Sequence, residues 1–198
     1  MEINEVTFTE GLNNVPGAFK AAFIQHSDCS VIPDVDNPNP ETSVSGADVC
    51  TVTGNIIMKP GKQAVEVYFT DKTGELTYEL QGADDSKSYK QMFKHSTPNR
   101  APGFAALCAK VKNNRGIMLI YMRGGETYML GGPRQPVRIE SLTGSFGTDA
   151  ASAASGMPTF FSEFNSAPFN KFLGKVMIGS GSGGGSGAGA TEQVLFAS

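Results

Sequence analysis

Histidines and cysteines are the side chains of this sequence best suited to metal binding. The chain has two histidines, His26 and His95, and three cysteines, Cys29, Cys50 and Cys108. His26 and Cys29 are close in sequence, but no second pair of the CxxC or HxxxH kind completes the ligand set of a zinc site. We therefore expect no metal site and no cofactor. The odd cysteine count excludes a complete disulfide framework and favours free thiols, although a Cys29–Cys50 bridge stays open.

Patterns typical of nucleophilic or acid–base catalysis are also missing. The sequence has no Gly-x-Ser-x-Gly, and its glycine-rich stretch 179–189 has no Gly-Lys-Ser/Thr for phosphate binding. Cys108 falls on the apolar face of a predicted helix, where a buried and inert thiol is expected. Asp84 and Asp85 follow Gly82 in a predicted turn, where adjacent carboxylates are usually solvated. The sequence therefore predicts a protein that is not an enzyme.

A loosely basic stretch is the main nucleic-acid signal. We interpret it as a solvated or subunit-contacting strand, because binding to phosphates needs closely clustered cations. In a strand, Lys90 and Lys94 share one face. The stretch comprises Lys87, Lys90, Lys94, His95 and Arg100, with Tyr89 and Phe93 interleaved.

Alternating apolar residues predict most of the elements that would position these side chains. Residues 64–70 and 76–80 predict two strands joined by a hairpin loop at 71–74. Residues 116–122 and 127–130 predict a second hairpin, with Gly124-Gly125 as a two-residue turn. The strand 116–122 is apolar on both faces, so one face is expected to meet the core and the other a helix or a neighbouring subunit. Further strands are predicted at 5–8, 55–58, 87–95, 136–146, 159–165 and 171–178.

One helix is predicted at 102–112, where Phe104, Leu107, Cys108 and Val111 recur at helical spacing. One helix among many strands predicts a mainly β (α+β) fold, a β-sandwich or rolled barrel with a single flanking helix. Long loops are expected at 30–48 and 148–156. Residues 1–178 would form the β domain, and 179–198 a Gly/Ser-rich C-terminal arm that ends in an apolar hook and docks on a neighbour.

Composition and apolar patterning bear on where the protein is made and whether it binds a membrane. The chain of 198 residues has a net charge of −3 and 24 glycines. It contains no signal-peptide pattern and no apolar run of the roughly 20 residues that cross a bilayer. We expect synthesis in a cytoplasm and no membrane partner.

The order of motifs resembles a known family. The sequence runs Gly54-Asn-Ile-Ile-Met-Lys-Pro-Gly-Lys62, then Gly74-Glu-Leu-Thr-Tyr-Glu-Leu80, then a helix and a Gly-Gly hairpin, and near its end Thr159-Phe-Phe-Ser-Glu-Phe-Asn-Ser-Ala-Pro168. Over residues 1–178 this resembles tail tube proteins of tailed bacteriophages, especially those infecting Bacteroidetes-type hosts. The arm 179–198 departs from the compact pattern of that family.

The resemblance implies a structural subunit of the virion tail, made in the host cytoplasm. Such subunits form six-fold rings that stack into a hollow tube, and double-stranded DNA passes through the lumen without sequence-specific binding. Partners would be copies of the chain and other tail proteins. Candidate subunit contacts are Ile117, Leu119, Tyr121, Asp71, Lys72, Val194, Leu195 and Phe196.

Two other functions fit the same composition. A capsid decoration or head–tail connector protein would share the arms and differ in symmetry. A ligand-binding or carbohydrate-binding β module would need exposed aromatic side chains on one face, and the chain has no Trp.

Overall fold

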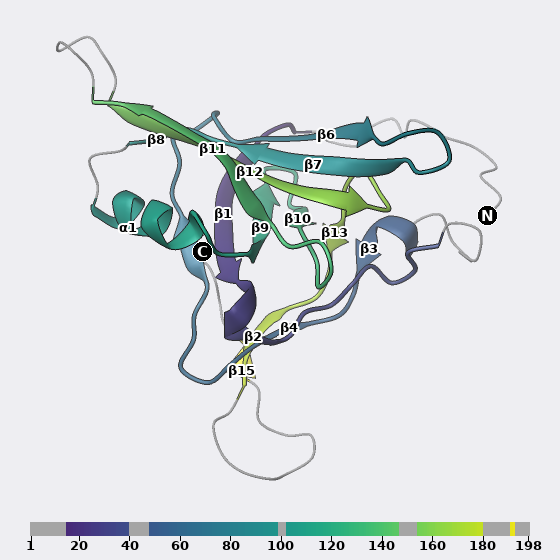
Figure 1. Ribbon diagram of the computed structural model, residues 1–198. Coiled ribbons are helices and arrows are strands. Elements are labelled where there is room, and N and C mark those ends of the chain that lie inside the picture. Colours follow the sequence, from purple (N-terminus) through teal and green to yellow (C-terminus); the bar gives the residue numbers. More distant parts are fainter. Residues whose placement is uncertain (1–14, 40–47, 99–101, 147–153, 180–190, 193–198) are drawn as a thin grey trace.

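The computed structural model describes residues 15–39, 48–98, 102–146, 154–179 and 191–192. It confirms a mainly β, α+β fold, with several sheets and a single α-helix in the described residues (Figure 1). Three sheets form three layers. We call them the upper, central and lower sheets after their places in Figure 1.

The central sheet has six strands in the order β3-β13-β10-β9-β1-β5. All its neighbours are antiparallel except β13 and β3, which are parallel. Its middle strand β9 is apolar at every position from Ile117 to Ile120. The strands are β1 (Ala18–Gln25), β3 (Thr51–Val52), β5 (Val65–Val67), β9 (Gly116–Met122), β10 (Thr127–Leu130) and β13 (Lys171–Phe172).

The other two sheets cover the two faces of the central one. The upper sheet has the order β11-β12-β7-β6, and β8 also pairs with β12. The lower sheet has the order β15-β14-β4-β2. Upper strands are β6 (Glu75–Gln81), β7 (Ser88–Lys94), β8 (Thr97–Pro98), β11 (Arg138–Ser145) and β12 (Ser155–Asn165). Lower strands are β2 (Cys29–Val31), β4 (Ile56–Met58), β14 (Val176–Ile178) and β15 (Thr191–Glu192). The α-helix is α1 (Pro102–Val111), and two short 3-10 helices are η1 (His26–Asp28) and η3 (Asp48–Cys50).

Two hydrophobic clusters separate the layers. Met118 and Ile120 of β9 belong to the upper cluster, which also takes in Leu107 of α1. Ile117 and Leu119 belong to the lower cluster. Alternate residues of a strand point to opposite faces, so β9 is buried on both sides by its own chain. This explains why its sequence is apolar throughout, as in strands covered on both faces.

The first predicted hairpin is wrong in its pairing. β5 pairs with β1 in the central sheet, whereas β6 pairs with β7 in the upper sheet. Residues 71–74 therefore carry the chain from one layer to the next. Phe69 is buried just before this crossover, and the Thr70 amide donates to the Ser96 carbonyl at 2.7 Å. Burial of Phe69 between the layers overrides the local pattern that suggested a hairpin.

The turn between β9 and β10 is one residue longer than predicted. The Met122 amide donates to the Glu126 carbonyl at 2.8 Å, and the Gly125 amide donates to the Met122 carbonyl at 3.0 Å. Gly125 has φ +88°, a left-handed conformation that glycine adopts without strain. The loop Arg123-Gly124-Gly125 thus ends in a glycine bulge.

Other elements follow the sequence with local changes. The strands predicted at 55–58, 87–95, 136–146 and 159–165, and the helix at 102–112, are present with shifted ends. The strand predicted at 171–178 is interrupted after Phe172 and divides between the central and lower sheets. β1, a central strand, was not predicted. The strand expected at 5–8 lies outside the described residues, as does most of the loop expected at 148–156.

Candidate functional site

The apolar stretch from Ile117 to Ile120 of β9 offers no surface to another subunit. Ile117 and Leu119 are both 0% exposed, and Tyr121 packs against the lower cluster. Burial raises the pKa of Tyr121 to about 12. The prediction that Ile117 and Leu119 contact a neighbour is therefore wrong, because the chain's own lower sheet covers their face.

The other candidate contacts lie elsewhere. Asp71 and Lys72 are exposed at the crossover between layers. Asp71 accepts a hydrogen bond from Arg123 in the β9–β10 loop. Lys72 has φ +63°, unusual for a residue with a side chain. These two residues stay predicted contacts, whereas Val194, Leu195 and Phe196 lie outside the described residues.

One end of the upper sheet projects beyond the core and is apolar. Register pairs Leu76 with Phe93 and Leu80 with Tyr89, so Leu76, Tyr78 and Leu80 share the core-side face of β6. Leu76 packs against the upper cluster. Tyr78 and Leu80, further along, are each 57% exposed. In Figure 1 this β6–β7 hairpin extends past the strands beneath it.

The opposite end of the upper sheet projects in the same way. There the β11–β12 pair extends past the strands of the central sheet and lies above α1 (Figure 1). Leu142 is 47% exposed, and Phe146, just after β11, is 69% exposed. Met157 is 41% exposed but lies on the opposite face from Leu142, because it pairs with Thr143. We call these two regions the projecting ends: Tyr78 and Leu80 at one, Leu142 and Phe146 at the other. Exposed apolar groups gathered in this way are typical of protein–protein contacts.

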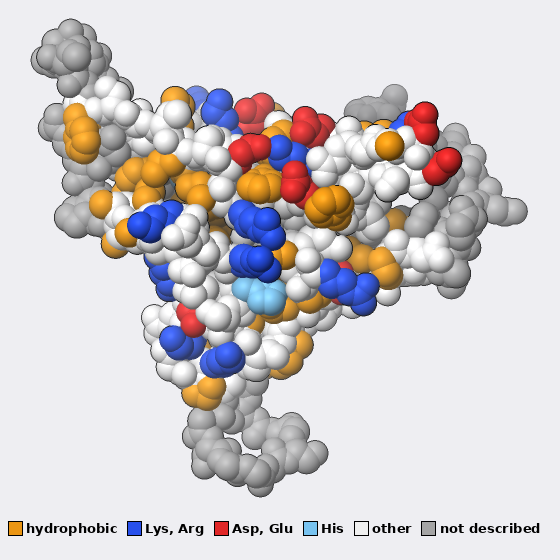
Figure 2. Space-filling model, viewed as in Figure 1, with side chains coloured by type: hydrophobic (Ala, Val, Ile, Leu, Met, Phe, Trp, Pro, Cys, Tyr) orange, Lys and Arg blue, Asp and Glu red, His pale blue; other side chains and the backbone are white. Residues whose placement is uncertain are grey.

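The outer face of the upper sheet is charged and centres on Lys90. Its Nζ lies 2.6 Å from Glu140 Oε1, 3.9 Å from Glu79 Oε1 and 5.3 Å from the Phe161 ring centroid. The hydrogen bond with Glu140 is the largest cause of a raised Lys90 pKa. Acidic and basic side chains both gather over this sheet in Figure 2. Strand alternation assigns to this face four carboxylates and three cations, which are Glu75, Glu79, Glu140, Glu163, Lys90, Lys94 and Arg138.

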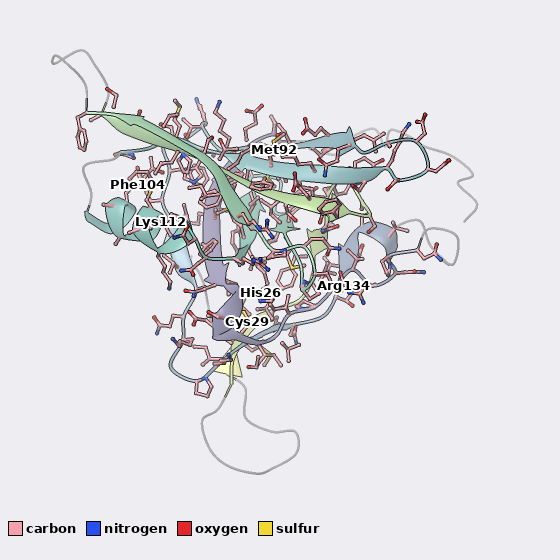
Figure 3. The ribbon with its side chains drawn as sticks, in the orientation of Figure 1. His26, Cys29, Met92, Phe104, Lys112 and Arg134 are labelled. Atoms are coloured by element: carbon pink, nitrogen blue, oxygen red, sulfur yellow. The ribbon has the colours of Figure 1, made fainter. Side chains whose placement is uncertain are left out.

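A basic area lies below the upper sheet. An isolated bridge between Gly116 and Val137 sets Arg115 beside Arg138, at the β11 edge of the upper sheet. His26 lies close to Arg134, because its Nε2 is 3.3 Å from the Pro133 carbonyl (Figure 3). Figure 2 shows Lys and Arg side chains in the middle of this face, next to a histidine in pale blue. The positive charge of these Lys and Arg side chains would attract an anionic surface.

His95 is buried rather than available for chemistry. Its side chain is 1% exposed and lies among Phe69, Phe93 and Phe160. Nδ1 is 3.0 Å from the Thr97 hydroxyl, and Nε2 has no hydrogen-bond partner. Burial lowers the pKa of His95 to about 4, so the ring is neutral near pH 7.

The other reactive side chains singled out from the sequence are the three cysteines and Asp84. Cys29, Cys50 and Cys108 form no disulfide bond. Burial raises the pKa of Cys29 to about 11, and burial also raises the pKa of Cys108. Asp84 lies in the β6–β7 turn, 3.2 Å from Lys87 Nζ. Within the described part of the chain, no three His, Cys, Asp or Glu residues are grouped to hold a metal ion.

Comparison with known proteins adds no relative. No protein-family model, curated protein or solved structure matches the chain. Among the described residues, no helix has the length and apolar character to cross a membrane. The projecting ends and the charged faces are therefore the basis for a functional proposal.

Proposed function

We propose that the protein is a structural subunit, without a catalytic centre or cofactor, that assembles with copies of itself into stacked rings. Because residues 1–178 resemble tail tube proteins, we propose that this assembly is the tail tube of a bacteriophage. The observation that carries the proposal is the pair of projecting ends, because each exposes apolar side chains on a sheet that extends beyond its own core.

The positions of the two ends favour a ring. They lie at opposite ends of one sheet, so a contact between Tyr78 and Leu80 of one copy and Leu142 and Phe146 of the next is head-to-tail. Head-to-tail contacts that close generate rings. β6 and β11 are also the edge strands of this sheet among the described residues, and they would continue the sheet from one copy to the next.

Charge suggests which face lines the lumen. The outer face of the upper sheet carries four carboxylates against three cations, and Lys90 at its centre is hydrogen-bonded to Glu140. A slightly acidic wall does not hold a phosphate backbone, so DNA would slide past it. Other tail proteins would bind the two ends of the tube, in the virion.

Symmetry tests the proposal directly. Native mass spectrometry and negative-stain electron microscopy of the purified full chain should give six-fold rings and hollow tubes. A trimer would favour a capsid decoration protein, and a twelve-fold ring a head–tail connector. A monomer at all concentrations up to about 1 mM would contradict self-assembly.

A further inference from the structure

An apolar groove runs along the free edge of the central sheet. It has a volume of about 370 Å³, within the range of binding pockets. One wall is formed by Val65 to Tyr68, the other by Phe104 and Leu107 of α1, with Pro98 of β8 at the side. All three residues of β5 and the following Tyr68 line it although strand side chains alternate between faces, so the groove follows the strand edge.

The strand beside the groove has an outer edge whose backbone N–H and C=O groups can pair with an added strand. β5 is the last strand of the central sheet, and no other described strand pairs with its outer edge. Tyr68, which follows it, is 69% exposed. Figure 3 shows Phe104 on the side of α1 toward β8. A strand edge next to an apolar helix face accepts an extended peptide, with main-chain hydrogen bonds on one side and side-chain contacts on the other.

We propose that this groove binds the C-terminal segment of the same chain, residues 193–198. The segment reads Gln-Val-Leu-Phe-Ala-Ser, with three consecutive apolar residues of high strand propensity. In an extended strand Val194 and Phe196 share a face. That face would lie against Phe104 and Leu107, and Leu195 would point the other way.

The lower sheet brings the chain toward this groove. Glu192 of β15 pairs with Met177, so a segment that continued in the same register would pass beside Val176. Val176 belongs to the lower cluster, and Ala64, immediately before β5, packs against that same cluster.

The direction and length of the segment also fit. β15 begins beside Ile178, whose partner in β4 is Met58, and runs away from Met58. β5 also runs away from this corner of the molecule, since its first residue, Val65, pairs with Phe23, near the end of β1. Six extended residues span about 20 Å, more than the roughly 13 Å of the four residues from Val65 to Tyr68. Binding of the segment to the groove of its own chain does not require ring formation.

Amide hydrogen exchange of the full chain tests the site. Replacing Val194, Leu195 and Phe196 by Asp should make those amides of residues 65–68 that point away from β1 exchange about tenfold faster. A control with the same added charge replaces Ser180, Ser182 and Ser186 by Asp and should change nothing there. Amides of β9 report in the same experiment that the fold is intact. Unchanged exchange at 65–68 in the first variant would overturn the proposal.

A second variant tests the groove from its other wall. Phe104→Asp should reproduce the faster exchange at 65–68, whereas Phe169→Asp, outside the groove, should not. Protection at 65–68 should be the same over a hundredfold range of protein concentration. Protection that rises with concentration would assign the segment to another copy and overturn the same-chain assignment.

Discussion

His95 stacks on Phe160 inside the upper cluster, with ring centroids 6.0 Å apart and ring planes 17° from parallel. His95 follows β7 and Phe160 lies in β12, so the contact joins two neighbouring strands of the upper sheet. The Nε2 atom of His95 is buried without a hydrogen-bond partner. A proton on this ring would place an uncompensated charge among aromatic side chains.

Stability should therefore depend on pH through His95. Its pKa is lowered from 6.5 to about 4, so between these values the unfolded chain takes up a proton that the folded chain does not. The contribution to the free energy of unfolding is complete above pH 6.5 and is lost as the pH falls toward 4, by about 3 kcal/mol. Urea unfolding at pH 7 and pH 4.5 measures it. His95→Phe should remove most of the difference, and an unchanged difference would contradict the assignment to His95.

Gly116 should not accept a side chain. A Cβ there would fall against the Phe23 ring and the Ile24 carbonyl. We expect Gly116→Ala to lower the free energy of unfolding by about 2–4 kcal/mol, since the packed core cannot move away. Gly103 in the first turn of α1 has open space around its Cα. Gly103→Ala should stabilise by about 0.5–1 kcal/mol, and thermal melting compares the two variants.

Leu80 should contribute to assembly and not to folding. It is 57% exposed at a projecting end, and Leu173, outside that end, is 59% exposed. Leu80→Asp should therefore shift the ring–monomer equilibrium at least tenfold toward monomer, with an unchanged melting temperature. Leu173→Asp introduces the same charge at a site of similar exposure and should leave rings intact. Analytical ultracentrifugation distinguishes them, and equal behaviour of the two variants would count against the projecting ends as the interface.

Lys90 and Glu140 should be energetically coupled across the upper sheet. β12 lies between their strands, and Lys90 reaches over Phe161 to Glu140 at 2.6 Å. The Lys90 side chain is only 14% exposed, so solvent screens the pair less than a surface pair. A double-mutant cycle with Lys90→Met and Glu140→Gln should give a coupling of about 1 kcal/mol. The exposed Lys87–Asp84 pair is the control and should show none that is measurable.

Local pattern predicted most strands but not their partners. The strand periodicity at 76–80 and the helical spacing at 102–112 were enough to place β6 and α1. The pairing of β5 with β1 was missed because it depends on Phe69 entering the core, a tertiary contact. β1 itself was missed because Ala18, Ala21 and Ala22 have low strand propensity, and only burial on both faces makes small residues suitable there.

For the candidate site, too, local pattern identified apolar strands but not what covers them. Ile117 and Leu119 were predicted as subunit contacts because β9 is apolar on both faces. A sequence does not reveal whether the second face is covered by another copy or by a later part of the same chain. The projecting ends were missed for the converse reason. Tyr78 and Leu80 follow an ordinary inward-facing pattern, and only the relative lengths of the stacked sheets leave them exposed.

The repeated passage of the chain between layers has a consequence for how the protein is made. The central sheet places β3, from residues 51–52, beside β13, from residues 171–172, and none of the three described sheets is formed by one uninterrupted stretch of chain. Such a topology has a high contact order and folds slowly. On the ribosome, the middle layer would stay incomplete until residue 172 has emerged. The central sheet of a nascent chain is therefore completed late in synthesis. Chains released before that point would expose β1 and β9 to aggregation.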